Sequence, residues 1–181
     1  MSQVSVPQTS AFHPFLLLVS RMAAFDPKRT LLATFGYLGS MHGTVEEVAS
    51  HWIAYARLGP DNAPEQVFAD GWVLVELVGD DPAAAWEVIK AVVRHYTLDE
   101  YYSVSRTEAQ EVVGLLAAGP IEDLLSEKGS LFISAIETEA ATDKRFAWAL
   151  GGVWQSTTPD DIWARVRRVA DDSYWERPSV E

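Results

Sequence analysis

The side chains able to do chemistry in this sequence are carboxylates and histidines, because the chain contains no cysteine. The absence of cysteine excludes thiol nucleophiles, disulfides, iron–sulfur clusters and cysteine-ligated zinc. Glu47 and His51 are four residues apart, so on a helix they share one face, and Tyr55 follows one turn later. This spacing is half of a metal site, but no second HExxH or ExxH pattern completes it, and the other three histidines stand alone. The sequence therefore predicts no metal or other cofactor, and it favours a surface or half-buried His51.

Glu76 is the one charged residue within the apolar run WVLVELV, residues 72–78. Burial would disfavour its charged form, and a carboxyl group with a raised pKa could serve as a general acid or base. The alternative is structural: Glu76 lies on the exposed edge of its helix, or it pairs with Arg94 or His95.

Further carboxylates lie in the second half of the chain. Glu122 and Asp123 follow a Gly-Pro pair at a predicted helix start, and Glu137 follows apolar residues near the end of the next helix. Paired carboxylates from adjacent helices could flank a sugar or hold a divalent ion. Acids in a first helical turn also stabilise the helix by up to about 1 kcal/mol, which is the simpler explanation of Glu122 and Asp123. For Glu137 we expect Arg145 or a backbone amide as partner.

Aromatic residues and motifs add one further candidate. Most of the seven tryptophans fit the apolar faces of helices, but Trp154 and Trp175 lie in or beside predicted turns and could face a ligand or partner. No GxGxxG or GxxxxGK[ST] motif occurs, so a known nucleotide-binding loop is not indicated. In residues 39–43 the serine directly follows the glycine, so this segment is a turn and not a nucleophile elbow.

Helices must position all of these residues. Helix-start signals, which are capping residues or prolines, occur at residues 26, 44, 64, 81, 105, 120, 130, 143 and 158. Gly129 and the pair Gly151-Gly152 are predicted breaks, and residues 98–104 are predicted to form an extended loop. The fold class is all-α: an irregular array or bundle of about eight to nine antiparallel helices, with HEAT-like hairpins as one possible arrangement.

Size and charge limit the organisation and the partners. A chain of 181 residues that is 48% hydrophobic suits one domain, with a core over residues 44–175 and an N-terminal helical extension over residues 1–40. The net charge is −12, and residues 41–100 alone hold eleven acidic and three basic residues. A nucleic acid or an anionic membrane is therefore disfavoured as partner. Without a basic secretory signal or a membrane span, we expect a cytoplasmic protein of bacterial type.

Residues 51–175 resemble a bacterial family of unknown function that comprises small, acidic, helical proteins. The segments that carry the resemblance are Trp52-Ile-Ala-Tyr55, Gly71-Trp-Val-Leu-Val-Glu76, Asp81-Pro-Ala-Ala-Ala-Trp86, Leu116–Leu125, Phe132–Glu137, Phe146–Leu150 and Val153-Trp154. The resemblance implies a helical domain. It brings no known activity and no catalytic residue.

Two classes of function follow from these observations. The first is a noncatalytic acidic module that binds another protein, a basic one in particular, as an immunity protein or inhibitor presents acidic surface to a toxin. The alternative is a small enzyme or ligand-binding protein with a carboxylate in a helical pocket. A homodimer, in which the partner is a second copy of the chain, is a third possibility. The candidate functional residues are Glu76, Glu137, Glu47, His51 and Trp154.

Overall fold

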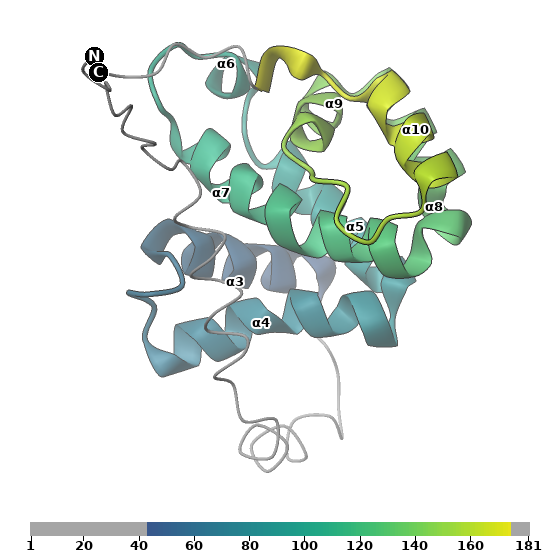
Figure 1. The fold of residues 1–181 in the computed structure, drawn as a ribbon. Helices are drawn as coiled ribbons and strands as arrows, with labels where there is room; N and C mark the ends of the chain where they lie inside the picture. The colour runs from purple at the N-terminus through teal and green to yellow at the C-terminus, as the bar shows by residue number, and fades with distance from the viewer. Residues whose placement is uncertain (1–42, 175–181) are drawn as a thin grey trace, which may run out of the picture. The chain divides into compact units, whose positions relative to one another are not determined.

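A computed structural model describes residues 43–174, which belong to one compact unit (Figure 1). No strand occurs in this part of the chain, so the predicted all-α class is confirmed. Its α-helices of eight or more residues are seven, fewer than the predicted eight to nine: α3 (Val45–Leu58), α4 (Glu65–Asp80), α5 (Pro82–Arg94), α7 (Glu108–Leu116), α8 (Glu122–Thr142), α9 (Lys144–Gly151) and α10 (Asp160–Val169). The predicted extension over residues 1–40, which includes His13, lies outside the described residues. His42 and Trp175 also lie outside them.

Local capping explains where the first helices begin and end. Thr44 accepts a hydrogen bond from the backbone N–H of Glu47 at 3.2 Å, and the Glu47 carboxylate accepts one from the N–H of Thr44 at 2.8 Å. Gly59 ends α3 in the left-handed region, with φ 75°. Asp81 caps α5 by accepting from the N–H of Ala84 at 3.0 Å. The three helices α3, α4 and α5 pack against one another.

Two expectations about residues 98–110 were wrong. Residues 98–104 do not form an extended loop throughout, because α6 (Leu98–Tyr101) is a single helical turn. The helix start predicted at residue 105 lies two residues later, where Thr107 and Gln110 form the capping box of α7. The Gln110 side chain is buried. It donates to the carbonyl of Tyr101 at 3.0 Å and to the carbonyl of Ser103 at 2.9 Å. These bonds satisfy carbonyls that a short helix leaves open, which is how α6 is held.

From Glu108 to Thr142 the chain is helical without a break. The segment η1 (Ala117–Ile121), which joins α7 to α8, is a π-helix that contains Pro120. Proline has no N–H and clashes with the carbonyl four residues earlier, and a wider π turn relieves this conflict. Gly129 does not end a helix, contrary to the prediction: it lies inside α8, where an added Cβ would lie 3.0 Å from Ile162 of α10. This glycine is used for close helix packing.

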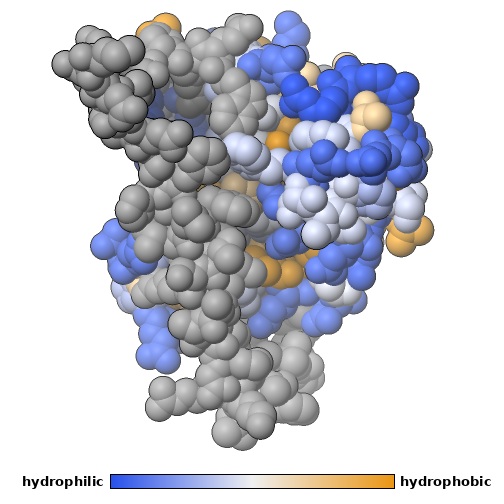
Figure 2. Space-filling model, in the orientation of Figure 1, coloured by the Kyte–Doolittle hydropathy of each residue, from blue (hydrophilic) through white to orange (hydrophobic). Residues whose placement is uncertain are grey.

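The core is rich in aromatic side chains. Trp148 and Tyr101 are in edge-to-face contact with ring centroids 5.1 Å apart, and Trp86 contacts Phe146 in the same way at 5.2 Å. Both tryptophans are buried, as the sequence predicted for most of them, whereas Trp154 is 45% exposed. Figure 2 shows that the described surface of one face is mainly hydrophilic, with hydrophobic residues in small groups. None of the described helices combines the length and the hydropathy needed to cross a membrane.

Candidate functional site

The predicted group on α3 does not come together as one site. Glu47 is exposed, and its carboxylate is used in the capping box of α3. His51 is exposed on the following turn. Tyr55 is buried in the interface with α4, where its ring meets Phe68 edge to face and an added Cβ at Gly71 would lie 2.7 Å from its Cγ. No group of three or more potential metal ligands occurs among residues 43–174.

Glu76 is half-buried in α4, on a different face from Leu74 and Leu77, which are completely buried. Its expected partner Arg94 instead donates to Glu139 of α8, with Nη2 2.5 Å from Oε1. The other expected partner, His95, packs edge to face on Tyr96. The structure therefore does not place Glu76 in the ion pair that the sequence suggested.

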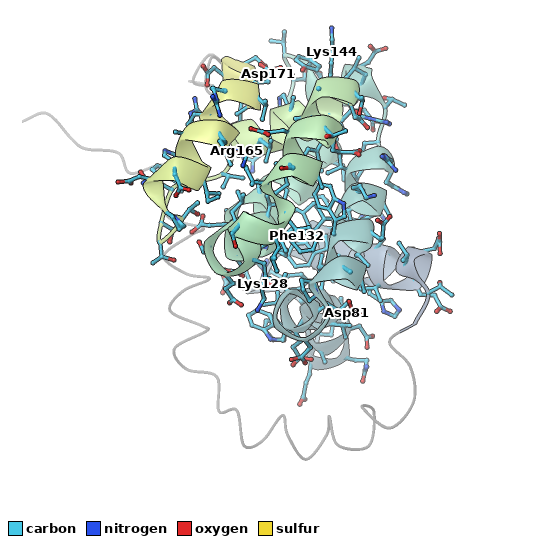
Figure 3. All side chains as sticks on the ribbon, turned by 90° about the vertical axis from the view of Figure 1, so that its right-hand side faces the viewer. Asp81, Lys128, Phe132, Lys144, Arg165 and Asp171 are labelled. Atoms are coloured by element: carbon cyan, nitrogen blue, oxygen red, sulfur yellow. The ribbon has the colours of Figure 1, made fainter. Side chains whose placement is uncertain are left out.

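Glu137 forms its ion pair with α10. Arg165 donates to both of its oxygens, from Nε at 2.9 Å and from Nη2 at 2.6 Å, and Arg168 lies 3.8 Å away. The prediction that Arg145 is the partner of Glu137 was therefore wrong. Figure 3 shows Arg165 on α10 beside α8. Hydrogen bonding from Arg165 lowers the pKa of Glu137, so this carboxylate is charged and engaged in joining two helices.

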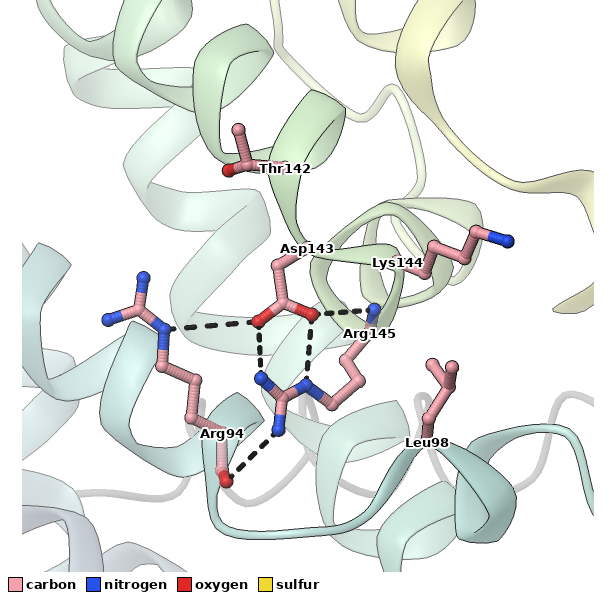
Figure 4. A pocket seen from close by; sticks show the side chains of 6 residues that line it. All are labelled: Arg94, Leu98, Thr142, Asp143, Lys144 and Arg145. Atoms are coloured by element: carbon pink, nitrogen blue, oxygen red, sulfur yellow. Dashed lines mark hydrogen bonds and ion pairs between the residues drawn. The ribbon is translucent and has the colours of Figure 1, made fainter.

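Arg145 is instead the partner of Asp143, which caps α9 (Figure 4). Its Nε and Nη2 donate to the two oxygens of Asp143 at 2.9 and 2.7 Å, and its Nη1 donates to the carbonyls of Arg94 and Tyr96 at the end of α5. Although burial opposes it, hydrogen bonding from Arg145 holds the pKa of Asp143 below its ordinary value. This cluster joins α5 to α9 and borders an open cleft of about 440 Å³.

The candidate functional site is a pair of adjacent carboxylates, Glu122 and Asp123, at the start of α8. Glu122 is only 6% exposed, and its Oε2 atom is buried without a hydrogen-bond partner. Desolvation, with the charge of Asp123, raises its pKa, although the Ser156 side chain and the backbone N–H of Trp154 favour the charged form. A buried carboxylate with an unused oxygen can bind a hydrogen-bond donor or a cation.

Asp123 is the more strongly perturbed member of the pair. Burial, followed by repulsion from Glu127, raises its pKa to about 6. No lysine or arginine nitrogen of residues 43–174 lies within 4.0 Å of either carboxylate of the pair. This pair differs in that respect from Glu137 and Asp143, which are neutralised by arginines.

The backbone around the pair is unusual on both sides. The π-helical segment η1 directly precedes Glu122, and π turns within helices are frequent at functional sites. On the facing loop between α9 and α10, Ser156 has φ 43°, the one positive φ of a non-glycine residue in the described chain. Ser126 of α8 and the buried Thr158 of the same loop lie within hydrogen-bond distance, at 3.2 Å. The exposed Trp154 belongs to this loop.

Glu122 and Asp123 do lie in the first turn of α8, as the sequence predicted, but stabilisation of a helix end does not fully explain them. Their turn is not a free helix end, because η1 continues directly into α8 and its residues are helical. An uncapped N-terminus, to which a carboxylate would be attracted, is therefore absent there. The sequence signal that could have identified the pair was the Gly-Pro dipeptide inside an otherwise continuous helical pattern, which also fits a π turn.

Comparison with curated proteins and with solved structures finds no significant match. A family model matches residues 59–174, within the region over which the sequence resembles a helical family of unknown function. This range includes the carboxylate pair and the loop that faces it. The chain therefore belongs to the family of unknown function DUF6869.

Proposed function

We propose that this domain is a noncatalytic module that binds a basic protein, as an immunity protein or inhibitor does. The observation that carries the proposal is the surplus of carboxylates on α3, α4 and α5. Residues 43–94 contain three cations, Arg57, Lys90 and Arg94, and nine carboxylates: Glu46, Glu47, Asp61, Glu65, Asp70, Glu76, Asp80, Asp81 and Glu87.

All three cations of this region already have carboxylate partners, and that of Arg94 is Glu139 of α8, at 2.5 Å. Arg57 lies 2.6 Å from Glu108 of α7, and Lys90 lies 2.8 Å from Glu87. The remaining carboxylates thus exceed the cations of their own helices. Mutual repulsion among like charges destabilises a folded chain, and a basic partner would relieve it while increasing the rate of association.

The carboxylate pair of α8 supplies an anchor for such a partner. η1 and α8 pack against α4. A lysine or arginine of the partner would neutralise the half-buried Asp123 in a partly desolvated environment, where ion pairs are stronger than at an open surface. The exposed Trp154 lies on the loop beside the pair and suits contact with a guanidinium group.

A second copy of the chain suits this surface less well. A two-fold interface brings the same patch of each copy together, so the carboxylates of one would face those of the other. We therefore assign the surface to a different, basic protein.

The experiment begins with the partner captured from the native host, purified and recombined with the full chain in calorimetric titration. We expect an equimolar complex with a basic protein. Glu65→Lys combined with Asp80→Lys should weaken it about 10- to 100-fold, because two attractive charges become repulsive. Both residues are exposed, and Asp80 lies at the end of α4, where a lysine suits the helix dipole.

The matched control is Asp99→Lys combined with Asp161→Lys, which makes the same change in charge at exposed residues of α6 and α10. Its affinity should stay within about threefold of the wild type. An equal loss of affinity in both double variants would mean that only net charge matters, which would contradict the proposed surface. An acidic partner, or an unchanged affinity in the α4 variant, would also contradict the proposal.

A small enzyme or ligand-binding protein is the second candidate function, and the raised pKa of Asp123 is what favours it. A carboxyl group with a pKa of about 6 can donate or accept a proton near neutral pH. The open cleft described above is lined by a different set of residues, in which Asp143 is neutralised by Arg145. We therefore rank binding of a basic protein first.

A further inference from the structure

The open cleft at the junction of α5, α6, α8 and α9 is rich in cations, although the chain is acidic. Three of its six lining residues are cations: it is lined by Arg94, Leu98, Thr142, Asp143, Lys144 and Arg145. Asp143 lies between the two arginines (Figure 4). With Glu139, which binds Arg94, the cluster holds three positive and two negative charges.

Lys144 is the cation that this cluster does not neutralise. The other nine lysines and arginines of residues 43–174 each have a carboxylate oxygen within 4.0 Å, and Lys144 has none. Its side chain is exposed and extends away from Asp143 in Figure 4. In a chain of net charge −12, a cation that forms no such pair at the edge of a cleft is available to a ligand.

Arg94 has donors left over as well. Its Nη2 binds Glu139 and its Nε lies 3.9 Å from Asp143, but Nη1 donates no hydrogen bond to the described residues. The Arg94 side chain is 49% exposed. Arginine donors and a lysine ammonium together are the groups that proteins use for phosphate and carboxylate oxygens.

The cleft also offers an apolar contact. Leu98, at the start of α6, is 42% exposed and forms part of the wall. A volume of about 440 Å³ is in the range of small-molecule sites and is too small for a folded partner. We propose that this cleft binds a small oxyanion with an apolar body, held by Lys144 and Arg94 and packed on Leu98. The proposal is independent of the acidic surface on α3–α5.

The test uses phenyl phosphate, benzoate and inorganic phosphate as probes for the full chain, in calorimetric titration at constant ionic strength. We expect saturable binding of phenyl phosphate or benzoate, and weaker binding of inorganic phosphate, which lacks the apolar group. Comparison of the first two probes distinguishes a phosphate ligand from a carboxylate ligand. Binding of none of the three below about 10 mM would overturn the proposal.

Two variants locate the binding. Lys144→Glu should weaken it at least tenfold and should still fold, because Lys144 has no carboxylate oxygen within 4.0 Å among the described residues and acts on Asp171 only at longer range. Leu98→Asp should have a similar effect by placing a carboxylate in the cleft. The control is Lys128→Glu, the same change in charge in the first half of α8, whereas the cleft lies at the other end of that helix, at Thr142 (Figure 3). Its affinity for the probes should stay within twofold of the wild type. An equal loss of affinity in this control would show nonspecific attraction and would contradict the proposed site.

Discussion

Gly151→Ala is expected to lower the free energy of unfolding by about 2 to 3 kcal/mol. An added Cβ at Gly151 would overlap the backbone carbonyl oxygen of Asp171 and lie 3.0 Å from Cβ of Tyr174. A backbone carbonyl cannot turn aside as a side chain does. The N–H of Asp171 also donates to the carbonyl of Ala147 at 2.9 Å, so a shift of this segment breaks a bond to α9.

The measurement is urea denaturation followed by circular dichroism, with Gly79→Ala as the matched control. Gly79 is exposed in α4, and an added Cβ there meets no atom within 4 Å. Alanine restricts the unfolded chain more than glycine does, so this variant should gain about 0.5 to 1 kcal/mol. If both variants lose stability equally, or if Gly151→Ala matches the wild type, the close contact between α9 and residues 171–174 is not as described.

Gly151 also shows why some features could not be predicted from the sequence. The break predicted at Gly151-Gly152 is confirmed, because α9 ends at Gly151 with Gly152 as its C-cap, but neither glycine has the positive φ that would make glycine necessary there. Both lie against the ring or backbone of residues 171–174. A glycine kept for close packing and a glycine kept for backbone freedom look alike in a sequence.

Helix starts could be predicted because capping is local. A capping side chain accepts a hydrogen bond from a backbone N–H two or three residues later. The three capping residues Thr44, Asp81 and Asp143 all do so. Ion pairs between helices depend on tertiary packing. Arg165 is 28 residues from Glu137 and Arg94 is 45 residues from Glu139, so neither pair follows from spacing. The sequence identified Glu122 and Asp123 as possible site residues but could not predict their burial, since the burial of Glu122 depends on a loop more than thirty residues away.

Asp123→Asn is expected to stabilise the protein at neutral pH by about 1 to 3 kcal/mol. The pKa of Asp123 is about 6 in the folded chain, against an ordinary value of 3.8, because burial disfavours the charged carboxylate. One pKa unit corresponds to about 1.4 kcal/mol, and partial exposure reduces the full difference. Asparagine carries no charge at any pH, so it avoids this cost.

The pH dependence has a definite sign. Between pH 4 and 6 the folded chain holds the Asp123 proton more tightly than the unfolded chain does, so the contribution of this group to stability falls as pH rises. The variant should therefore equal the wild type near pH 4, exceed it increasingly up to about pH 6.5, and keep a constant advantage above that. Comparing the two proteins at each pH removes the opposite contributions of Glu137 and Asp143, whose pKa values are lowered.

Urea denaturation between pH 4 and 8 measures this difference, and two further variants test its cause. Asp99→Asn, at an exposed residue of α6, should change stability little at any pH. Glu127→Gln removes the charge that repels Asp123, so the transition should move to lower pH. A difference that is constant from pH 4 to 8 would show that Asp123 has an ordinary pKa.

A residue that lowers stability in the free protein points to a role in the bound state, since stabilising replacements are easily found. If a basic side chain of a partner neutralises Asp123, the ion pair lowers its pKa and removes the cost. Asp123→Asn should then gain stability while binding the partner about tenfold more weakly. A variant that is more stable and binds equally well would exclude Asp123 from the interface, and would leave the carboxylates of α3–α5 as the part of the surface to test.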